Sequence, residues 1–356
     1  MIKKTRFLSS LALFAWACGS PPPPAPPEPV PAAPPPPAPT AEPAPPEPTP
    51  EEKAQAEARA KLEQDVRDME QKARAEAERW TPEMRANAKQ LAEAKYPSVR
   101  AAFAKLEKSP HRVPGHAERD QYRHPVETLE FFGLKPTMTV LEVGPGEGWF
   151  TELLAPMLAA RGQLIVTTTD PNGPATERST MYGRRFQLFK DKAPELYGKI
   201  QTIVIDPKQP SLGLAGTLDM VVVMRGMHGW QQSGVVAAWL SQIHAALKPN
   251  GVLGIEQHRA LAGANPDESA KKGYLDEAWV IQQVEAAGFK LAKKSEINAN
   301  PKDTKDHPDG VWSLPPSLRQ GDTDRAKYEA IGESDRMTLR FTKQAQKPTA
   351  EVKAGG

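Results

Sequence analysis

The stretch Val140-Leu141-Glu142-Val143-Gly144-Pro145-Gly146-Glu147-Gly148 is the most informative part of this 356-residue chain. Its glycines let the backbone approach a ligand closely and adopt angles closed to other residues. The run before it, 139–143, is apolar and β-branched, as in a buried strand. Apolar residues then recur at helical spacing over 149–160, and the free N–H groups that begin such a helix can bind a carboxylate or phosphate. The stretch therefore predicts a strand, a ligand-binding turn and a helix.

Strands and helices alternate outward from this turn. Continuous apolar strands between amphipathic helices are typical of a largely parallel sheet covered on both faces. We therefore expect an α/β, Rossmann-like, doubly wound fold. The predicted strands span 139–143, 164–169, 202–205, 220–224, 252–255, 289–297 and 337–342, and the main predicted helices span 149–160, 235–247 and 274–287.

Acidic residues accompany the first three predicted strands. Glu142 lies two residues before the first glycine, Asp170 ends the second strand and Asp206 ends the third. Ligands of open parallel sheets bind at the carboxyl ends of the strands, so this combination indicates more than a glycine turn alone. The spacing is G-x-G-x-G, and Trp149 stands where a dinucleotide-binding turn needs its third glycine. A nicotinamide-dependent dehydrogenase is therefore the weaker interpretation.

These residues resemble the class I S-adenosylmethionine-dependent methyltransferases over roughly residues 111–343. The resemblance implies S-adenosylmethionine as cofactor and a seven-stranded sheet whose last strand is antiparallel. It also implies that Asp170 holds the ribose hydroxyls and that Asp206 lies near the adenine amine. The implied cofactor-binding residues are Glu142, Gly144, Pro145, Gly146, Gly148, Asp170 and Asp206.

Within that family the chain looks most like bacterial proteins known only as predicted methyltransferases. Three stretches carry this likeness: Arg123-His124-Pro125, Arg225-Gly226-Met227-His228, and Asn300-Pro301-Lys302-Asp303-Thr304-Lys305-Asp306-His307-Pro308. The likeness implies no particular substrate. We expect the methyl acceptor to be a small molecule or an exposed polar group.

Methyl transfer from a sulfonium is an in-line displacement, so the enzyme must position the nucleophile and remove its proton where needed. A base is therefore expected at the ends of the fourth and fifth strands. His228 is the first choice as general base, Glu256 and His258 come next, and Arg225 is a candidate substrate anchor. Each of these residues could instead have a purely structural role.

Two further segments are candidates for covering the site. Asp120, Arg123 and His124 precede the first strand, where such segments often cover the cofactor; they could equally cap a helix or form a salt bridge between helices. The insertion 298–335 separates the last two strands, and its mixture of charges with Trp312 suggests a lid over a polar substrate. His228, His258, Asp306 and His307 lack ligand-like spacing, so no metal site is predicted.

The N-terminal composition differs from the rest. Residues 1–17 combine a basic start with a short apolar run, as in a signal peptide, and Cys18 follows small residues, as in bacterial lipoproteins. The alternative is a plain signal peptide, or none, with an incidental cysteine. Residues 18–50 hold nearly half of the 38 prolines and predict a disordered tether, and 51–110 predicts charged helices. The expected domain spans 111–343, and 344–356 is an expected disordered tail.

Charge and location limit the function further. The net charge is only +2, which gives no support to nucleic-acid binding, and the oligomeric state cannot be predicted. A lipid anchor on Cys18 would place the protein on the periplasmic side of the cell envelope, whereas S-adenosylmethionine is made in the cytosol. This conflict leaves an alternative open: a non-catalytic, envelope-anchored ligand-binding or interaction module built on a methyltransferase fold.

Overall fold

A computed structural model describes residues 49–344. The expected signal segment 1–17, Cys18, nearly all of the expected tether and the tail from residue 345 onward lie outside the described residues. Within 49–344, none of the helices combines the length and apolar character needed to cross a membrane.

The centre of the fold is a seven-stranded sheet with the order β3-β2-β1-β4-β5-β7-β6. Strands β1 to β5 are parallel, and β7 is antiparallel to both of its neighbours. The predicted Rossmann-like fold, with its antiparallel last strand, is therefore confirmed. The strands are β1 (Thr139–Val143), β2 (Gln163–Thr168), β3 (Gln201–Val204), β4 (Leu218–Met224), β5 (Leu247–His258), β6 (Phe289–Ser295) and β7 (Arg336–Lys343).

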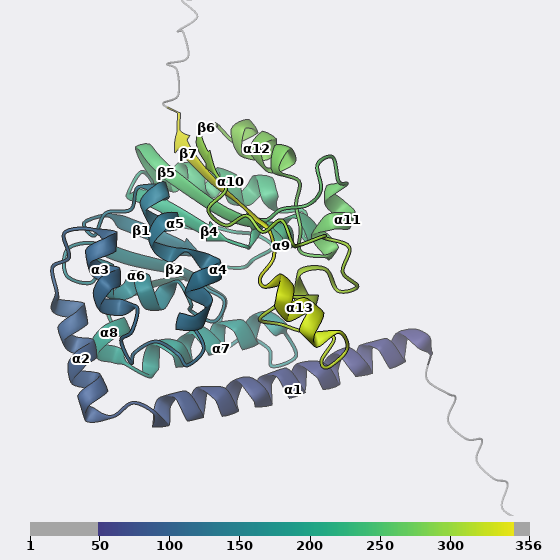
Figure 1. Ribbon diagram of the computed structural model, residues 1–356, viewed down its shortest axis with the longest axis horizontal. Helices are drawn as coiled ribbons and strands as arrows, with labels where there is room; N and C mark the ends of the chain where they lie inside the picture. Colours follow the sequence, from purple (N-terminus) through teal and green to yellow (C-terminus); the bar gives the residue numbers. More distant parts are fainter. Residues whose placement is uncertain (1–48, 345–356) are drawn as a thin grey trace, which may run out of the picture. The chain divides into compact units, whose positions relative to one another are not determined.

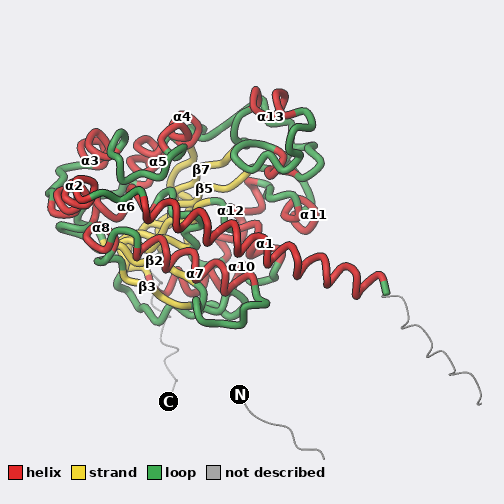
Figure 2. The backbone as a smooth tube through the Cα atoms, turned by 90° about the horizontal axis from the view of Figure 1, so that it is seen from below, coloured by secondary structure: helices red, strands yellow, loops and turns green. Residues whose placement is uncertain are grey.

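Helices cover both faces of the sheet, and Figure 2 shows the strands, in yellow, enclosed among them. The longer ones are α1 (Pro50–Glu78), α2 (Pro82–Glu93), α3 (Val99–Leu106), α5 (Pro125–Phe132), α6 (Thr151–Leu158), α7 (Arg178–Asp191), α10 (Val236–Ala246), α12 (Glu277–Ala286) and α13 (Arg325–Ile331). The short ones are η1 (Ala117–Arg119), α4 (Asp120–Arg123), α8 (Pro194–Tyr197), α9 (Met227–Gln232), α11 (Pro266–Lys271) and η2 (Gly310–Ser313).

Alternation along the strands divides the apolar core into two halves. Val140 of β1 packs with α2, α3, α5, α6, α7 and α8, whereas its neighbour Leu141 packs with α9, α10 and α12. Successive strand side chains point to opposite faces, so β1, β2, β4 and β5 contribute to both halves, whereas β3, β6 and β7 contribute to the second half alone. Both faces of the central strands are buried, and this is why β1, β2 and β4 read as nearly continuous apolar runs.

The charged N-terminal helix α1 lies along α7, as Figure 1 shows at the lower edge of the molecule. Leu62 and Met69 are buried against Met181 of α7, and Asp65 pairs with Arg178 at 2.7 Å. Most of the remaining α1 side chains are exposed. The first of the predicted charged helices is therefore solvated on one side and packed on α7 on the other.

Candidate active site

The glycine-rich turn lies where the strand order reverses, between β1 and β4, at the carboxyl ends of the parallel strands. Thr167 of β2 accepts a hydrogen bond from the N–H of Gly144 at 3.0 Å. Gly144 and Gly146 have φ of 64° and 63°, and a Cβ on either would meet no atom within 4 Å. The turn therefore exposes its backbone to open space, as close approach of a ligand requires.

Gly148 serves a different purpose in the same turn. A Cβ at this position would come within 2.5 Å of the Phe189 ring, and φ is 83°. Here glycine allows α7 to pack against the turn. Gly144 and Gly146 face the ligand space, whereas Gly148 supports the turn from behind.

Two cavities meet at Gly144, Pro145, Gly146 and Gly226. The first, of about 390 Å³, is called the apolar cavity below. Its walls come from the ends of β1, β2 and β3 and from α7, α9 and α10. The remaining lining residues are Val143, Thr167, Thr168, Thr169, Tyr182, Arg185, Phe186, Ile205, Pro207, Gly229, Trp230, Ser233, Val235 and Trp239.

Asp170 and Asp206 lie next to this cavity but do not line it. Each is exposed, and each accepts a backbone N–H two residues ahead, from Asn172 at 2.8 Å and from Lys208 at 2.9 Å. In both cases this bond uses one carboxylate oxygen, Oδ1. Their predicted contacts with ribose and adenine stay predictions.

The second cavity, of about 340 Å³, is called the polar cavity. It lies beyond the turn, toward the ends of β4 and β5. Its walls also include the segment before β1 and the insertion before β7. The remaining lining residues are Arg119, Arg123, Glu142, Glu147, Trp149, Phe150, Met224, Arg225, His258, Val311, Trp312, Pro315, Pro316, Ser317, Glu333 and Ser334.

Glu256 sits beneath the polar cavity and holds two arginines. Its side chain is inaccessible to solvent. Its oxygens accept hydrogen bonds from Arg225 at 3.0 and 3.1 Å, and Arg336 lies 3.1 Å from Oε1. A buried carboxylate between two guanidinium groups is a structural anion rather than a free base. The structure thus places Glu256 away from the cavity surface and Arg225 on it.

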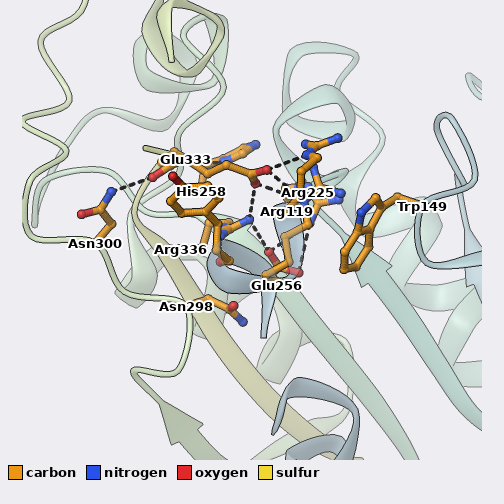
Figure 3. Close-up of polar contacts among 12 residues, drawn as sticks. Arg119, Trp149, Arg225, Glu256, His258, Asn298, Asn300, Glu333 and Arg336 are labelled. Carbon is orange, nitrogen blue, oxygen red and sulfur yellow. Dashed lines mark hydrogen bonds and ion pairs between the residues drawn. The ribbon is translucent and has the colours of Figure 1, made fainter. Parts of the chain in front are cut away.

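Glu333 gathers three arginines at the opposite wall. Arg119 donates through Nε at 2.8 Å, Arg123 through Nε at 3.1 and 3.2 Å, and Arg336 through Nη1 at 2.9 Å. Arg336 therefore joins the two glutamates into one network, which Figure 3 shows as dashed lines. We call these four arginines and two glutamates the arginine network.

Glu142 is buried at the end of β1 and lines the polar cavity. Burial raises the pKa of its carboxyl to about 7, although Thr151 donates a hydrogen bond at 2.7 Å and Arg225 lies nearby, both of which act in the opposite direction. Near neutral pH this carboxyl therefore exists in both the protonated and the ionised form.

The two candidate bases are neighbouring imidazoles, with ring centroids 6.0 Å apart. His258 lines the polar cavity, and its Nδ1 lies 2.6 Å from Ser334 Oγ. His228 lies behind it, 3.4 Å from the amide of Gln257. Burial lowers the pKa of His228 to about 4 and that of His258 well below its usual value, and Arg225 lowers both further. Both rings are therefore neutral at neutral pH.

The segment before β1 is fixed over the turn by a second buried ion cluster. Glu152 of α6 binds Arg112 at 3.1 Å and His116 at 2.9 Å, and Arg112 also pairs with Asp120. The indole N–H of Trp149 donates to the backbone carbonyl of His116 at 2.9 Å. Arg119 and Arg123 project from this segment into the polar cavity, whereas Asp120 serves within the cluster.

The insertion 298–335 is folded and joined at its two ends. The side-chain amide of Asn300 donates to the carbonyls of Ile331 at 2.8 Å and Glu333 at 2.7 Å. The buried carboxylate of Asp303 accepts a hydrogen bond from the backbone N–H of Asp335 at 2.9 Å. The conspicuous stretch 300–308 thus ties the start of the insertion to its end. Trp312 and the residues around Pro315 and Pro316 form one wall of the polar cavity.

No cluster of three or more His, Cys, Asp or Glu side chains within residues 49–344 is arranged to hold a metal ion.

Sequence reasoning did not single out Arg119, Glu333, Ser334 or Arg336 for the site. Arg119 and Arg123 are four residues apart, which would have placed them on one helical face. The other three depend on the register of β7 with β5, in which Arg336 is opposite His258. A local pattern does not contain that register.

The sequence matches the profile of a known protein family. The sequence profile of the family described as "Methyltransferase domain" matches residues 116–293, half of the chain. No curated protein sequence matches the chain.

Solved structures with similar folds include three methyltransferases of low identity. A SAM-dependent methyltransferase from Aquifex aeolicus is 16% identical, with a TM-score of 0.42, covering 63% of this chain and 92% of its own. The N-methyltransferase NodS from Bradyrhizobium japonicum WM9 is 15% identical, with a TM-score of 0.41 and coverage of 64% and 97%. A Burkholderia thailandensis 1,6-didemethyltoxoflavin-N1-methyltransferase, with bound 1,6-didemethyltoxoflavin and S-adenosylhomocysteine, is 14% identical, with a TM-score of 0.39 and coverage of 64% and 80%.

Proposed function

Because the chain belongs to the methyltransferase-domain family, we propose that it transfers a methyl group from S-adenosylmethionine to a small-molecule acceptor. The observation that carries the proposal is the pair of cavities that meet at Gly144 and Gly146. One cavity is large enough for the nucleoside part of a cofactor, and the other opens onto charged and aromatic side chains. A displacement reaction needs two ligands brought together at such a junction.

S-adenosylmethionine is the cofactor, and the residues of the apolar cavity fit it. When bound, it supplies a methyl group on a positively charged sulfur. Tyr182, Phe186 and Trp230 offer apolar surface for a planar base, and the threonines at the end of β2 offer hydroxyl groups. The bare backbone of Gly144 and Gly146 leaves room where a side chain would intrude.

The protein's own residues orient the acceptor and accept its proton. His258 is the proposed base because it lines the polar cavity, is neutral, and leaves Nε2 without a hydrogen-bond partner among the described residues. Ser334 holds its Nδ1 and so fixes the ring. His228, the first choice from the sequence, lies behind this ring and becomes a candidate for supporting it.

Calorimetry with S-adenosylhomocysteine tests the proposal. Gly146→Val is expected to weaken binding at least a hundredfold, because the added side chain would occupy space the ligand needs. Gly213→Val is a matched control, since Gly213 also has a positive φ of 62° and open space around it but lines neither cavity. If wild type does not bind, or if both variants bind like wild type, the proposal is wrong.

Two observations favour catalysis over a binding-only module. The family match spans the glycine turn and both candidate histidines, and the two cavities share Gly144, Pro145, Gly146 and Gly226 as lining residues. For location we keep the proposal of a lipid anchor on Cys18 at the cell envelope, which the motif around Cys18 supports. Palmitate labelling of wild type and Cys18→Ala tests it: an unlabelled, cytosolic wild-type protein would overturn it.

A further inference from the structure

We infer that the methyl acceptor carries an oxyanion, a carboxylate or a phosphate, that is bound by Arg119, Arg123 and Arg225 of the polar cavity. This inference rests on the proposed methyl transfer and names the chemical class of its substrate.

The arginine network carries more positive than negative charge. The arginine network contains four guanidinium groups, all always charged, against two carboxylates. The side chains of Glu256 and Arg336 are at most 2% exposed, so bulk water screens these charges poorly. Glu142 compensates incompletely, because burial raises its pKa to about 7, and Glu147 is exposed. The cavity wall is therefore positively charged, and burying unpaired cations is costly unless an anion joins them.

Three arginines of the polar cavity have N–H groups that bond to no other described residue. Arg119 and Arg123 each use only Nε toward Glu333, so neither pair of Nη groups has a partner among the described residues. Arg225 uses only Nη1, toward Glu256. All three side chains line the polar cavity. Two parallel N–H donors at the end of a guanidinium group match the oxygens of a carboxylate or phosphate.

The cofactor's own carboxylate does not balance the positive charge of the cavity. S-adenosylmethionine carries one carboxylate, one ammonium and one sulfonium, so its binding adds a net positive charge. One arginine could be satisfied by that carboxylate, but the cavity as a whole would become more positive. An anionic acceptor is what restores the balance and also brings a negative charge toward the positive sulfur.

The walls indicate the shape of this acceptor. Arg123 lies 4.7 Å from the centre of the Trp149 ring, Arg225 lies 5.7 Å from that of Phe150, and Trp312 of the insertion lines the same cavity. The aromatic rings attract the guanidinium groups without using their N–H donors, so these donors stay available to a ligand. A small planar acid fits a cavity of about 340 Å³ with such walls.

The test is calorimetry of the full chain, saturated with S-adenosylhomocysteine, against benzoate and phenyl phosphate and their neutral counterparts benzamide and phenol. We expect the anions to bind at least tenfold more tightly than the neutral compounds, with the difference shrinking as NaCl rises. Arg119→Gln is expected to remove most of this preference. Arg225→Gln is an independent second variant because it pairs with a different glutamate, and Arg100→Gln, which loses an exposed pair with Glu130, is the control.

The outcomes separate the possible failures. Failure of S-adenosylhomocysteine to bind at all would remove the proposed function itself. Binding of S-adenosylhomocysteine without any preference for anions would overturn only the present inference. A third arm uses 5′-methylthioadenosine, which lacks the amino-acid carboxylate. If Arg119→Gln and Arg225→Gln weaken S-adenosylhomocysteine but change neither 5′-methylthioadenosine nor benzoate binding, the arginines serve the cofactor and the inference is wrong.

Discussion

The apolar and the polar cavity lie on either side of one glycine turn, yet they are built from different parts of the chain. The apolar cavity comes from the alternating strands and helices: the ends of β1, β2 and β3 with α7, α9 and α10. The polar cavity adds the segment before β1 and the insertion before β7. The regular fold thus supplies the mostly apolar surface together with Glu142 and Arg225, and the additions to it supply Arg119, Arg123 and Glu333. Specificity for the acceptor is expected to reside in those additions.

Removing the charge beneath the polar cavity should give the largest effect. Glu256→Gln leaves Arg225 and Arg336 without one of their carboxylates, and an uncompensated buried charge costs roughly 3–5 kcal/mol. Urea unfolding should show a loss of this size. Glu147→Gln is the control, because Glu147 lines the same cavity but is exposed. Equal stability of the two variants would show that the network is not a buried structural unit.

Glu142, which lines the polar cavity, should make the stability of the protein depend on pH. Its folded pKa of about 7 lies above the usual value of 4.5, so between these values the folded protein holds a proton that the unfolded chain has released. Its contribution to the unfolding free energy therefore falls as pH rises through this window, by on the order of 1–3 kcal/mol. Glu142→Gln cannot ionise, so wild type should lose stability relative to this variant between pH 5 and pH 8. Parallel curves would contradict the raised pKa.

A substitution of Asp170 tests ligand binding in the apolar cavity. If it holds the ribose hydroxyls, Asp170→Asn should weaken S-adenosylhomocysteine and 5′-methylthioadenosine equally, by about tenfold, the effect of losing roughly 1.4 kcal/mol from a charged hydrogen bond. The benzoate affinity of the saturated protein should not change. An effect on S-adenosylhomocysteine alone would assign Asp170 to the amino-acid end of the ligand.

Asp206 should give the smallest effect. Its neighbours Ile205 and Pro207 line the apolar cavity, while its own side chain is exposed and accepts a hydrogen bond from the backbone N–H of Lys208. Asp206→Asn keeps the size of the side chain, and a solvated contact to adenine contributes little, so we expect a two- to threefold loss of affinity in calorimetry. A tenfold loss would mean that this carboxylate turns into the cavity when the ligand binds.

The predicted strands matched the observed sheet closely, and the central ones did so because each is a nearly continuous apolar run, whereas β6 and β7 carry charged residues among their apolar ones. The main error in the strands was the start of β5, which begins at Leu247, five residues before the expected start. Helix α7 was not predicted: apart from its aromatic residues it is rich in Arg and Lys, with Gly183 near its middle. Its helical state depends on packing against the turn and α1, and local propensity does not report such contacts.

The sequence by itself determined the Rossmann-like sheet, the turn at Gly144 to Gly148 and the cluster of polar residues at the ends of β4 and β5. Those features rest on local patterns: apolar runs, closely spaced glycines and polar side chains near the end of a strand. Only the tertiary structure decided that Glu256 is a buried anion, that His258 rather than His228 lines the cavity, and that Arg119, Glu333 and Arg336 join them. These contacts join residues up to 214 positions apart, and they arise from strand register and from a folded insertion, which no local pattern encodes.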